Sequence, residues 1–372
     1  MQIVKVEVVP MELGLRLPYR TAYHADQQVE RVGVVFVRLE TRQGDVAWGC
    51  AAFEPAITGE TLESVTRVCR ACADRARDLS PLNLEYALSE LAQLTAGVPA
   101  AQCAFDIAFH DLLGLAARQP LYRLLGGYRD RIQTSITIGM GSVRETVAMA
   151  RERAQQGFRI LKLKGGLSPN DDVRRIRAIR DALPELTLRL DAEQGYSVKQ
   201  AIDVARALRC RLVMLEQPTP ARELEALADV TEHSPVPILA DESVMGPPAA
   251  LDIVSRRGAH GISIKLVTCG GLRCARQVDA VARRVALVRR MRRLQKVHHV
   301  VQHLIVGKRQ VLFQNRPFLL RFGEVHHDLR LQAGVDIFGQ LERRGVVVHR
   351  RHHAEVLMRM DLNARHDRLD IA

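Results

Sequence analysis

The chain of 372 residues contains no run of eighteen apolar residues, whereas a helix that crosses a membrane needs about twenty. Its first ten residues, MQIVKVEVVP, are typical of a first β-strand rather than of a signal peptide. The seven cysteines are an odd number and form no small-domain disulfide framework, which fits a reducing compartment. We therefore expect a cytoplasmic protein with no membrane partner.

A second cysteine or histidine pair is missing beside the CxxC of Cys69 and Cys72. This pair lies in TRVCRACADRAR, where a spacing of three residues places both thiols on one face of a helix. Structural zinc needs four ligands, and the surrounding sequence supplies only these two. The pattern favours buried thiols over a metal or redox site.

Residues 281–372 contain no Ser, Thr, Cys, Tyr or Trp, although Ser and Thr make up roughly a tenth of an average chain. They hold 19 Lys and Arg against 8 Asp and Glu, so nearly all of the net charge of +12 lies there. We hypothesise that the reading frame is shifted near residue 281. The rival hypothesis is a basic extension that binds nucleic acid, but the missing Tyr and Trp leave few side chains for base stacking. We therefore expect no nucleic-acid partner.

Residues 1–280 have the alternation of a folded α/β protein. Residues 1–60 contain three strand-like segments, and residues 61–125 have helical spacing of apolar residues. From residue 134 onward, short apolar runs alternate with amphipathic helical stretches, which predicts repeated βα units. These runs are TSITIG, ILKLKGG, LTLRLDAEQG, LVMLEQP, PILADES and GISIKLVTCGG.

Charged residues end five of these runs at spacings of 27, 25, 25 and 24 residues, namely Lys164, Asp191, Glu216, Asp241 and Lys265. One strand, one helix and two loops take about that many residues, so each charge falls at the same place in successive units. In a (β/α)8 barrel this place is the C-terminal rim, where active sites form. A doubly wound sheet is the alternative, but six units without a Gly-rich phosphate loop favour the barrel.

Three carboxylates at neighbouring strand ends repel one another unless a cation lies between them. Mg²⁺ takes oxygen ligands and leaves positions for water and substrate. We therefore interpret Asp191, Glu216 and Asp241 as a Mg²⁺ site.

Lys162 and Lys164 lie two residues apart, so in a strand they share one face. They come from the strand before the acidic set, and Lys265 comes from the strand after it. A substrate carboxylate on the metal would have an acidic neighbouring C–H, because the cation stabilises the enolate. We expect one of the paired lysines to act as a base and the other to lower its pKa.

The segments LKLKGG, LRLDAEQGY, LEQP, LADES and ISIKLVTCGGL resemble successive strand ends of the enolase superfamily, in its muconate-lactonizing enzyme and mandelate racemase-like part. The resemblance implies an N-terminal α+β capping domain at residues 1–125 and a modified TIM barrel whose strands 1–6 lie in residues 126–280. It also implies Mg²⁺ on the three carboxylates, Lys164 and Lys265 as acid and base on opposite faces, and Lys162 as an auxiliary cation.

Within this family, PYRTAYH, EPAITGET and TSITIG are similar to dipeptide epimerases of the L-Ala-D/L-Glu type. The implied activity is epimerisation of a small carboxylate substrate, a dipeptide, with Tyr19, Arg20 and His24 lining its cavity. Muconate cycloisomerase and o-succinylbenzoate synthase carry the same catalytic set and stay as alternatives. The resemblance also allows a homo-oligomer.

The chain departs from the family pattern in three places. Gly49-Cys50 stands where Gly-Glu is common, and Asp191-Ala192-Glu193 stands where Asp-Ala-Asn is common. Residues 281–372 show no motif of barrel strands 7 and 8, whose loss would open the barrel. An inactive relative with a tail that binds polyanions is therefore the alternative of another class.

Overall fold

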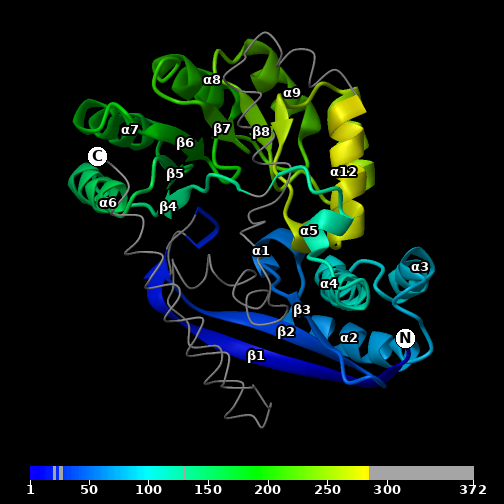
Figure 1. The fold of residues 1–372 in the computed structure, drawn as a ribbon. Coiled ribbons are helices and arrows are strands. Elements are labelled where there is room, and N and C mark those ends of the chain that lie inside the picture. The colour runs from blue at the N-terminus through cyan, green and yellow to red at the C-terminus, as the bar shows by residue number, and fades with distance from the viewer. Residues whose placement is uncertain (20–21, 25–27, 130, 285–372) are drawn as a thin grey trace.

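The computed structural model describes residues 1–19, 22–24, 28–129 and 131–284. These residues form two units: an antiparallel sheet covered by helices, and a parallel sheet with helices along its outside (Figure 1). No helix in the described ranges is long and apolar enough to cross a membrane.

The first unit contains an antiparallel sheet in the order β1-β2-β3, which confirms the three strands expected from the sequence. The helices expected between residues 61 and 125 are present as well. The elements of this unit are β1 (Ile3–Tyr19), the 3-10 helix η1 (Ala22–His24), β2 (Val29–Thr41), β3 (Val46–Ala51), α1 (Pro55–Thr58), α2 (Leu62–Ala76), α3 (Leu84–Leu94), α4 (Pro99–Ala116) and α5 (Leu121–Leu124).

Strand β2 shows why this sheet binds helices on one face. Its alternate residues Val35, Val37 and Leu39 are buried in the same cluster as residues of α2, α3 and α4, as the two-residue period of a strand requires. At Gly49 in β3 the backbone touches α4, because a Cβ there would lie 1.7 Å from the carbonyl oxygen of Ala104. Only glycine allows this approach.

The second unit is a sheet of six parallel strands in the order β4-β5-β6-β7-β8-β9. Its elements are β4 (Ile136–Ile138), α6 (Val143–Gln155), β5 (Ile160–Lys164), α7 (Pro169–Ala182), β6 (Thr187–Asp191), α8 (Val198–Ala207), β7 (Met214–Glu216), α9 (Leu224–His233), β8 (Ile238–Ala240), α10 (Pro247–Ser255), β9 (Gly261–Ile262), α11 (Leu266–Cys269) and α12 (Leu272–Arg284).

Serine side chains mark where three of these helices begin. Ser142, Ser168 and Ser197 are the N-cap residues of α6, α7 and α8, and each hydroxyl accepts a hydrogen bond from a backbone N–H of the first turn. Such caps satisfy amide groups that have no partner within the helix. The repeat of strand, loop and capped helix therefore has the same local chemistry in three successive units.

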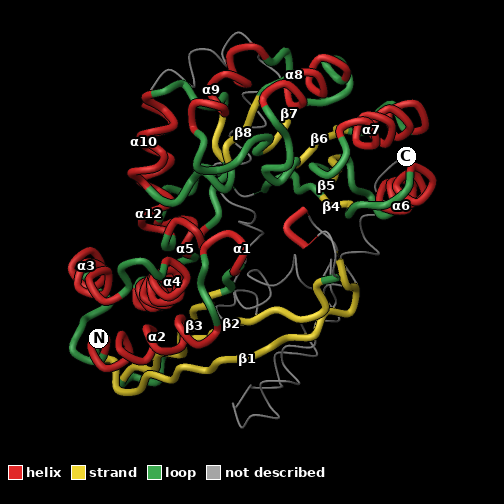
Figure 2. Tube along the Cα trace, turned by 180° about the vertical axis from the view of Figure 1, so that it is seen from behind, coloured by secondary structure: helices red, strands yellow, loops and turns green. Residues whose placement is uncertain are grey.

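The strands follow one another in chain order, with helices α6 to α10 and α12 outside them (Figures 1 and 2). This arrangement is that of a barrel and differs from a doubly wound sheet, in which the strand order reverses. The expected loss of strands 7 and 8 concerns residues that lie outside the described ranges. The segment that starts at residue 281 begins inside α12, which continues to Arg284.

Helix α4 of the first unit packs against α11 and α12 of the second. Both carboxylate oxygens of Asp106 accept backbone hydrogen bonds from the start of α12, at 2.6 Å from Leu272 and 3.1 Å from Arg273. His110, one turn later on α4, lies 3.2 Å from the same carboxylate. The first unit thus caps a helix of the second.

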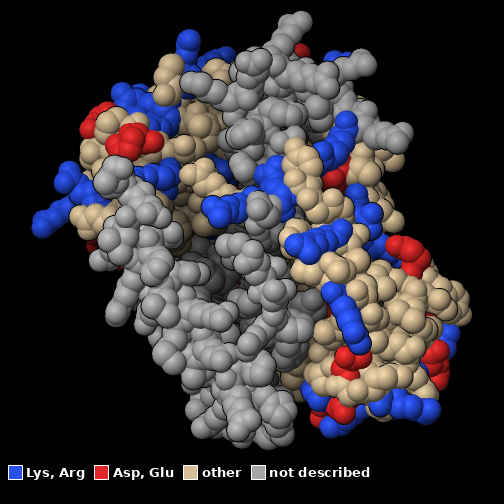
Figure 3. Space-filling view, in the orientation of Figure 1, with Lys and Arg blue, Asp and Glu red and all other residues tan. Residues whose placement is uncertain are grey.

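Charged side chains of both signs are spread over the face seen in Figure 3. Residues 1–280 contain 35 Lys and Arg against 34 Asp and Glu. Residues 1–280 as a whole therefore carry nearly balanced charge, in contrast to residues 281–372.

Candidate active site

The sequence-predicted site residues lie together at the C-terminal ends of the parallel strands. Lys164, Asp191 and Glu216 are the last residues of β5, β6 and β7, and the strand pairing places them side by side. Asp241 directly follows β8, and Lys265 precedes α11 as its N-cap residue. The regular spacing in the sequence therefore corresponds to neighbouring positions in space.

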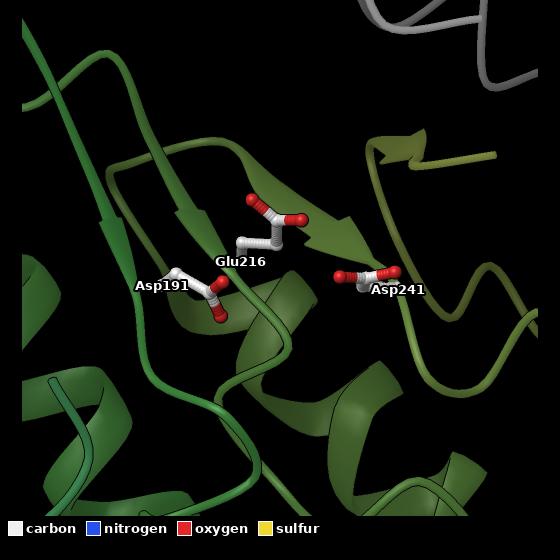
Figure 4. Close-up of side chains that lie close together, drawn as sticks. All are labelled: Asp191, Glu216 and Asp241. Atoms are coloured by element: carbon white, nitrogen blue, oxygen red, sulfur yellow. The ribbon is translucent and has the colours of Figure 1, made fainter. Parts of the chain in front are cut away.

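The three carboxylates form one buried cluster, with a ligand oxygen from each lying within 4.8 Å of the others (Figure 4). Glu216 lies between Asp191 and Asp241, as its strand lies between theirs. Lys265 Nζ pairs with Asp241 Oδ2 at 2.7 Å, whereas Asp241 Oδ1 receives no hydrogen bond within the described residues. Buried carboxylate oxygens need a partner, so this cluster suits a cation.

The three lysines contact the cluster from its two ends. Lys162 Nζ lies 2.8 Å from Asp191 Oδ2 and 2.9 Å from Glu216 Oε2, and Lys164 Nζ lies 3.0 Å from Asp191 Oδ2. Lys265 reaches the other end of the cluster, at Asp241. The interpretation that Lys162 and Lys164 face one space is confirmed by their shared partner Asp191.

The cluster shifts the pKa values of its members. Burial alone would raise the pKa of Asp191, but Lys162 and Lys164 lower it below its usual range. Burial and the neighbouring carboxylates Asp191 and Asp241 raise the pKa of Glu216. Like charges thus disfavour ionisation of the central carboxylate, as expected for a site built around a cation.

The pKa of Lys164 is raised, which differs from the sequence-based expectation. Burial lowers it and so does the ammonium of Lys162, but the charges of Asp191 and Glu193 outweigh both. The pKa of Lys265 is raised as well, since Asp241 and Glu242 outweigh its burial. The sequence-based expectation included the ammonium of Lys162. It did not include the carboxylates that lie beside Lys164 and Lys265.

Two glycines bring the loops after β5 and β6 into backbone contact. A Cβ on Gly166 would lie 2.1 Å from the carbonyl oxygen of Ala192, and one on Gly195 would lie 2.1 Å from that of Gly166. Gly166 also has a φ of 108°, which L side chains avoid. The glycines of LKLKGG and DAEQGY therefore hold these two strand ends together.

A buried polar network supports the loop that follows Lys164. Asp172 accepts a hydrogen bond from the backbone N–H of Gly166 at 2.9 Å, and also binds Arg175 and the hydroxyl of Tyr196. Arg175 donates to the carbonyl oxygen of Lys164 at 2.8 Å. Sequence reasoning missed these residues, because the network joins the loop after β5 to α7 and to Tyr196 after β6, and no local pattern encodes such contacts.

Gln217 performs a similar task for Asp241. Its Oε1 accepts the backbone N–H of Asp241 at 2.8 Å, and its Nε2 donates to the hydroxyl of Ser243 at 2.8 Å. Gln217 directly follows Glu216 in LEQP, and Ser243 ends LADES. The polar residues of both motifs thus orient a carboxylate of the cluster.

The predicted cavity residues have mixed outcomes. Tyr19 ends β1 and His24 ends η1, whereas Arg20 lies outside the described residues. Their role as substrate-lining residues stays a prediction. Sequence reasoning missed Tyr23 of the same PYRTAYH motif, whose pKa is raised by its burial and by the charges of Glu242, Glu193 and Asp191.

Family models match most of the described chain. Residues 3–126 match the mandelate racemase / muconate lactonizing enzyme N-terminal domain, and residues 145–291 match the enolase C-terminal domain-like model. Residues 292–372 lie outside both matches. These matches confirm the resemblance seen in the strand-end motifs.

Several curated proteins are similar to this chain. The hydrophobic dipeptide epimerase of Enterococcus faecalis is 34% identical over 283 residues, which cover 76% of this chain and 79% of that protein. The L-Ala-D/L-Glu epimerase of Clostridium acetobutylicum is 34% identical over 289 residues, with the same two coverages.

Solved structures show the same similarity. The E. faecalis dipeptide epimerase complexed with Mg and L-Leu-L-Tyr gives a TM-score of 0.73 at 34% identity, covering 76% of this chain and 80% of that one. The substrate-liganded L-Ala-D/L-Glu epimerase from Bacillus subtilis gives 0.73 at 32% identity and the same coverages. This chain therefore belongs to the mandelate racemase / muconate lactonizing enzyme family of the enolase superfamily, with its N-terminal capping domain and its C-terminal barrel domain.

Proposed function

We propose that this protein is a Mg²⁺-dependent dipeptide epimerase, an isomerase that inverts the Cα next to the substrate carboxylate. The observation that carries the proposal is the pair Lys164 and Lys265 at opposite ends of one buried carboxylate cluster. A single base exchanges a proton on one face of a carbon. Two amines on opposite sides can remove it from one face and return it to the other.

The donor set of the cluster fits Mg²⁺, which prefers oxygen ligands, and Asp191, Glu216 and Asp241 would hold it. When bound, the cation would stabilise the negative charge that develops on the substrate carboxylate and would make the adjacent C–H more acidic. Relatives of this chain were crystallised with Mg and a dipeptide, which supports the same occupancy here.

The chain's own residues account for the proton transfers. Lys164 Nζ takes the Cα proton from one side, and Lys265 Nζ delivers a proton to the other. Lys162 keeps its charge, because Asp191 and Glu216 raise its pKa well above the ordinary value despite its burial. Its ammonium favours the neutral form of Lys164 and adds positive charge beside the substrate carboxylate.

The comparisons favour epimerisation over the cycloisomerase and o-succinylbenzoate synthase alternatives. Relatives at 34% identity are named dipeptide epimerases, and one at 27% is named an N-succinyl-L-Arg/Lys racemase. All of these names describe inversion at an amino acid Cα. The domain boundary near residue 125, the cytoplasmic location and a homo-oligomeric state stay predictions.

The inactive, polyanion-binding alternative rests on residues 281–372, of which 285–372 lie outside the described ranges. Resequencing the coding region tests the frame-shift hypothesis, because an unbroken frame through residue 281 contradicts it. An extension that binds nucleic acid would retain the protein on DNA in a salt-dependent way.

The function is tested by incubating the purified full chain with Mg²⁺ and a small set of L,L-dipeptides, and by following the diastereomers formed. We expect inversion that stops when Mg²⁺ is chelated and in Lys164→Ala and Lys265→Ala proteins. Lys199→Ala removes an exposed lysine of α8 and is the matched control. Inversion that survives in either active-site variant would contradict the proposal.

A further inference from the structure

Glu193 has a strained and buried position next to the metal-binding cluster. It lies two residues after Asp191, only 4% of its surface is exposed, and its φ is 43°. The following residue, Gln194, also has a positive φ, of 67°. Two consecutive left-handed residues that are not glycine persist only where the surrounding contacts hold them.

The contacts that hold Glu193 join two parts of the molecule. One carboxylate oxygen, Oε1, binds Lys164 Nζ, and the other, Oε2, accepts the backbone N–H of Ala22 at 2.6 Å. Ala22 belongs to η1 of the capping domain, 171 residues away in the chain. One oxygen of Glu193 therefore binds the amine of Lys164, and the other binds the capping domain.

Gln194 strengthens the same connection. Its Nε2 donates to the hydroxyl of Tyr23 at 2.7 Å, and its Oε1 accepts the backbone N–H of Ala221 at 2.6 Å. The two strained residues thus contact two successive residues of η1 and the loop after β7. With positive φ at both positions, the side chain of Glu193 reaches Ala22 and the side chain of Gln194 reaches Tyr23 of the capping domain.

We propose that Glu193 is a positioning residue that holds the amine of Lys164 in place by tying it to Ala22 of the capping domain. This inference rests on the proposed function, in which Lys164 exchanges the substrate proton. Lysine has a flexible four-carbon side chain, and proton transfer is fast only when donor and acceptor are held at the right distance.

The test compares Glu193→Gln with the wild type in D₂O, using dipeptides of both configurations at the reacting Cα and full Mg²⁺ loading. The configuration served by each lysine is identified first with Lys164→Ala and Lys265→Ala proteins. Glu193→Gln keeps the size of the side chain and one acceptor, and loses one of the two contacts. Glu185→Gln makes the same chemical change at an exposed residue before β6 and is the control.

We expect deuterium uptake that depends on Lys164 to fall by about tenfold or more in Glu193→Gln, as for a misplaced catalytic group. Deuterium uptake that depends on Lys265 and leaves the Cα configuration unchanged should stay within about twofold of the wild type. The substitution changes nothing on that side of the cluster. Equal losses on both faces, or no loss on either, would overturn the inference. Glu193→Asn replaces Glu193→Gln if the latter does not fold.

A second measurement separates this inference from the function itself. Hydrogen exchange at the amide of Ala22, read in the Mg²⁺-loaded protein without substrate, should be faster in Glu193→Ala, which removes both acceptor oxygens, than in the wild type or Glu185→Ala. If the wild type exchanges no dipeptide proton, the proposed function is wrong. The hydrogen exchange of Ala22 then still tests whether Glu193 connects the two domains. Unchanged protection of Ala22 would then overturn the connection.

Discussion

Individual residues at the strand ends carry the proposed chemistry. Lys162 is buried and contacts Asp191 and Glu216, whereas Lys164 contacts Asp191 and Glu193. The two amines share Asp191 and differ in their second partner, which is Glu216 for Lys162 and Glu193 for Lys164. In the proposed mechanism Lys162 stays charged, and its ammonium favours the neutral form of Lys164, which exchanges the proton.

Lys162→Gln should shift the pH dependence of deuterium exchange. The ammonium of Lys162 lowers the pKa of Lys164 and of Lys265, so its removal raises both values. Because a lysine base acts in its neutral form, the rising limb of the pH–rate profile should move to higher pH. An unshifted profile, or one moved to lower pH, would contradict the assigned role. The exposed Lys199→Gln variant serves as control.

The residues of the site differ in how far the sequence alone predicts them. The three carboxylates and three lysines were predictable, because equal spacing along a βα repeat means equal position on the rim. Tyr23 was not, although it lies in the motif that held Tyr19 and His24. Its contact with Gln194 joins residues 171 positions apart, and no local pattern encodes such a pairing.

At the scale of elements, the contact between α4 and its neighbours determines how the two domains meet. β3 approaches α4 through Gly49, and α12 begins on the carboxylate of Asp106. The helical spacing of the sequence predicted α4 correctly. It did not predict that α4 would cap a helix of the other domain, because the partner amides lie more than 160 residues later.

Gly49→Ala should destabilise the protein strongly. A Cβ at this position would lie 1.7 Å from the carbonyl oxygen of Ala104, so β3 and α4 must move apart. We expect a loss of about 3 kcal/mol or more in the free energy of unfolding, at the upper end for an overpacked core. Gly139→Ala is the control, since nothing lies within 4 Å of its Cβ position and its φ is not positive. Comparable denaturation midpoints for the two variants would contradict this packing.

His110→Gln should remove a pH-dependent contribution to stability. Burial lowers the pKa of His110, but its contacts with Asp106 outweigh burial and raise it. A raised pKa in the folded state means that the stabilisation is complete below the unfolded pKa, near 6.5, and is lost as pH rises through the folded value. The difference in unfolding free energy between wild type and variant should shrink from pH 5 to pH 9 in denaturant titrations. A difference that grows with pH would contradict the contact.

At the scale of the whole molecule, the capping domain reaches the barrel at both ends of the carboxylate cluster. Near Lys164 the link is Glu193 with Ala22, and beyond Lys265 it is Asp106 with the start of α12. The sequence predicted the two domains and the six successive barrel strands. It did not predict these links, because each depends on how the domains pack.

Mg²⁺ should stabilise the whole molecule through the three carboxylates. A ligand that binds only the folded state adds about 2.7 kcal/mol at 100 times its Kd, so thermal unfolding should occur at a higher temperature with Mg²⁺ than with chelator. Asp241→Asn should lose most of this increase, because it removes one of three charged ligands. An equal rise of the unfolding temperature in the wild type and in Asp241→Asn would show that Mg²⁺ binds at another site.

The proposed epimerisation requires that Lys164 and Lys265 act on opposite faces of one Cα. The most direct measurement follows deuterium uptake from D₂O into each of the two Cα configurations of a dipeptide substrate, in Lys164→Ala and Lys265→Ala proteins loaded with Mg²⁺. We expect each variant to lose uptake into one configuration and to retain it in the other, with the pattern reversed between the variants. Loss of the same configuration in both variants, or full uptake in either, would contradict it.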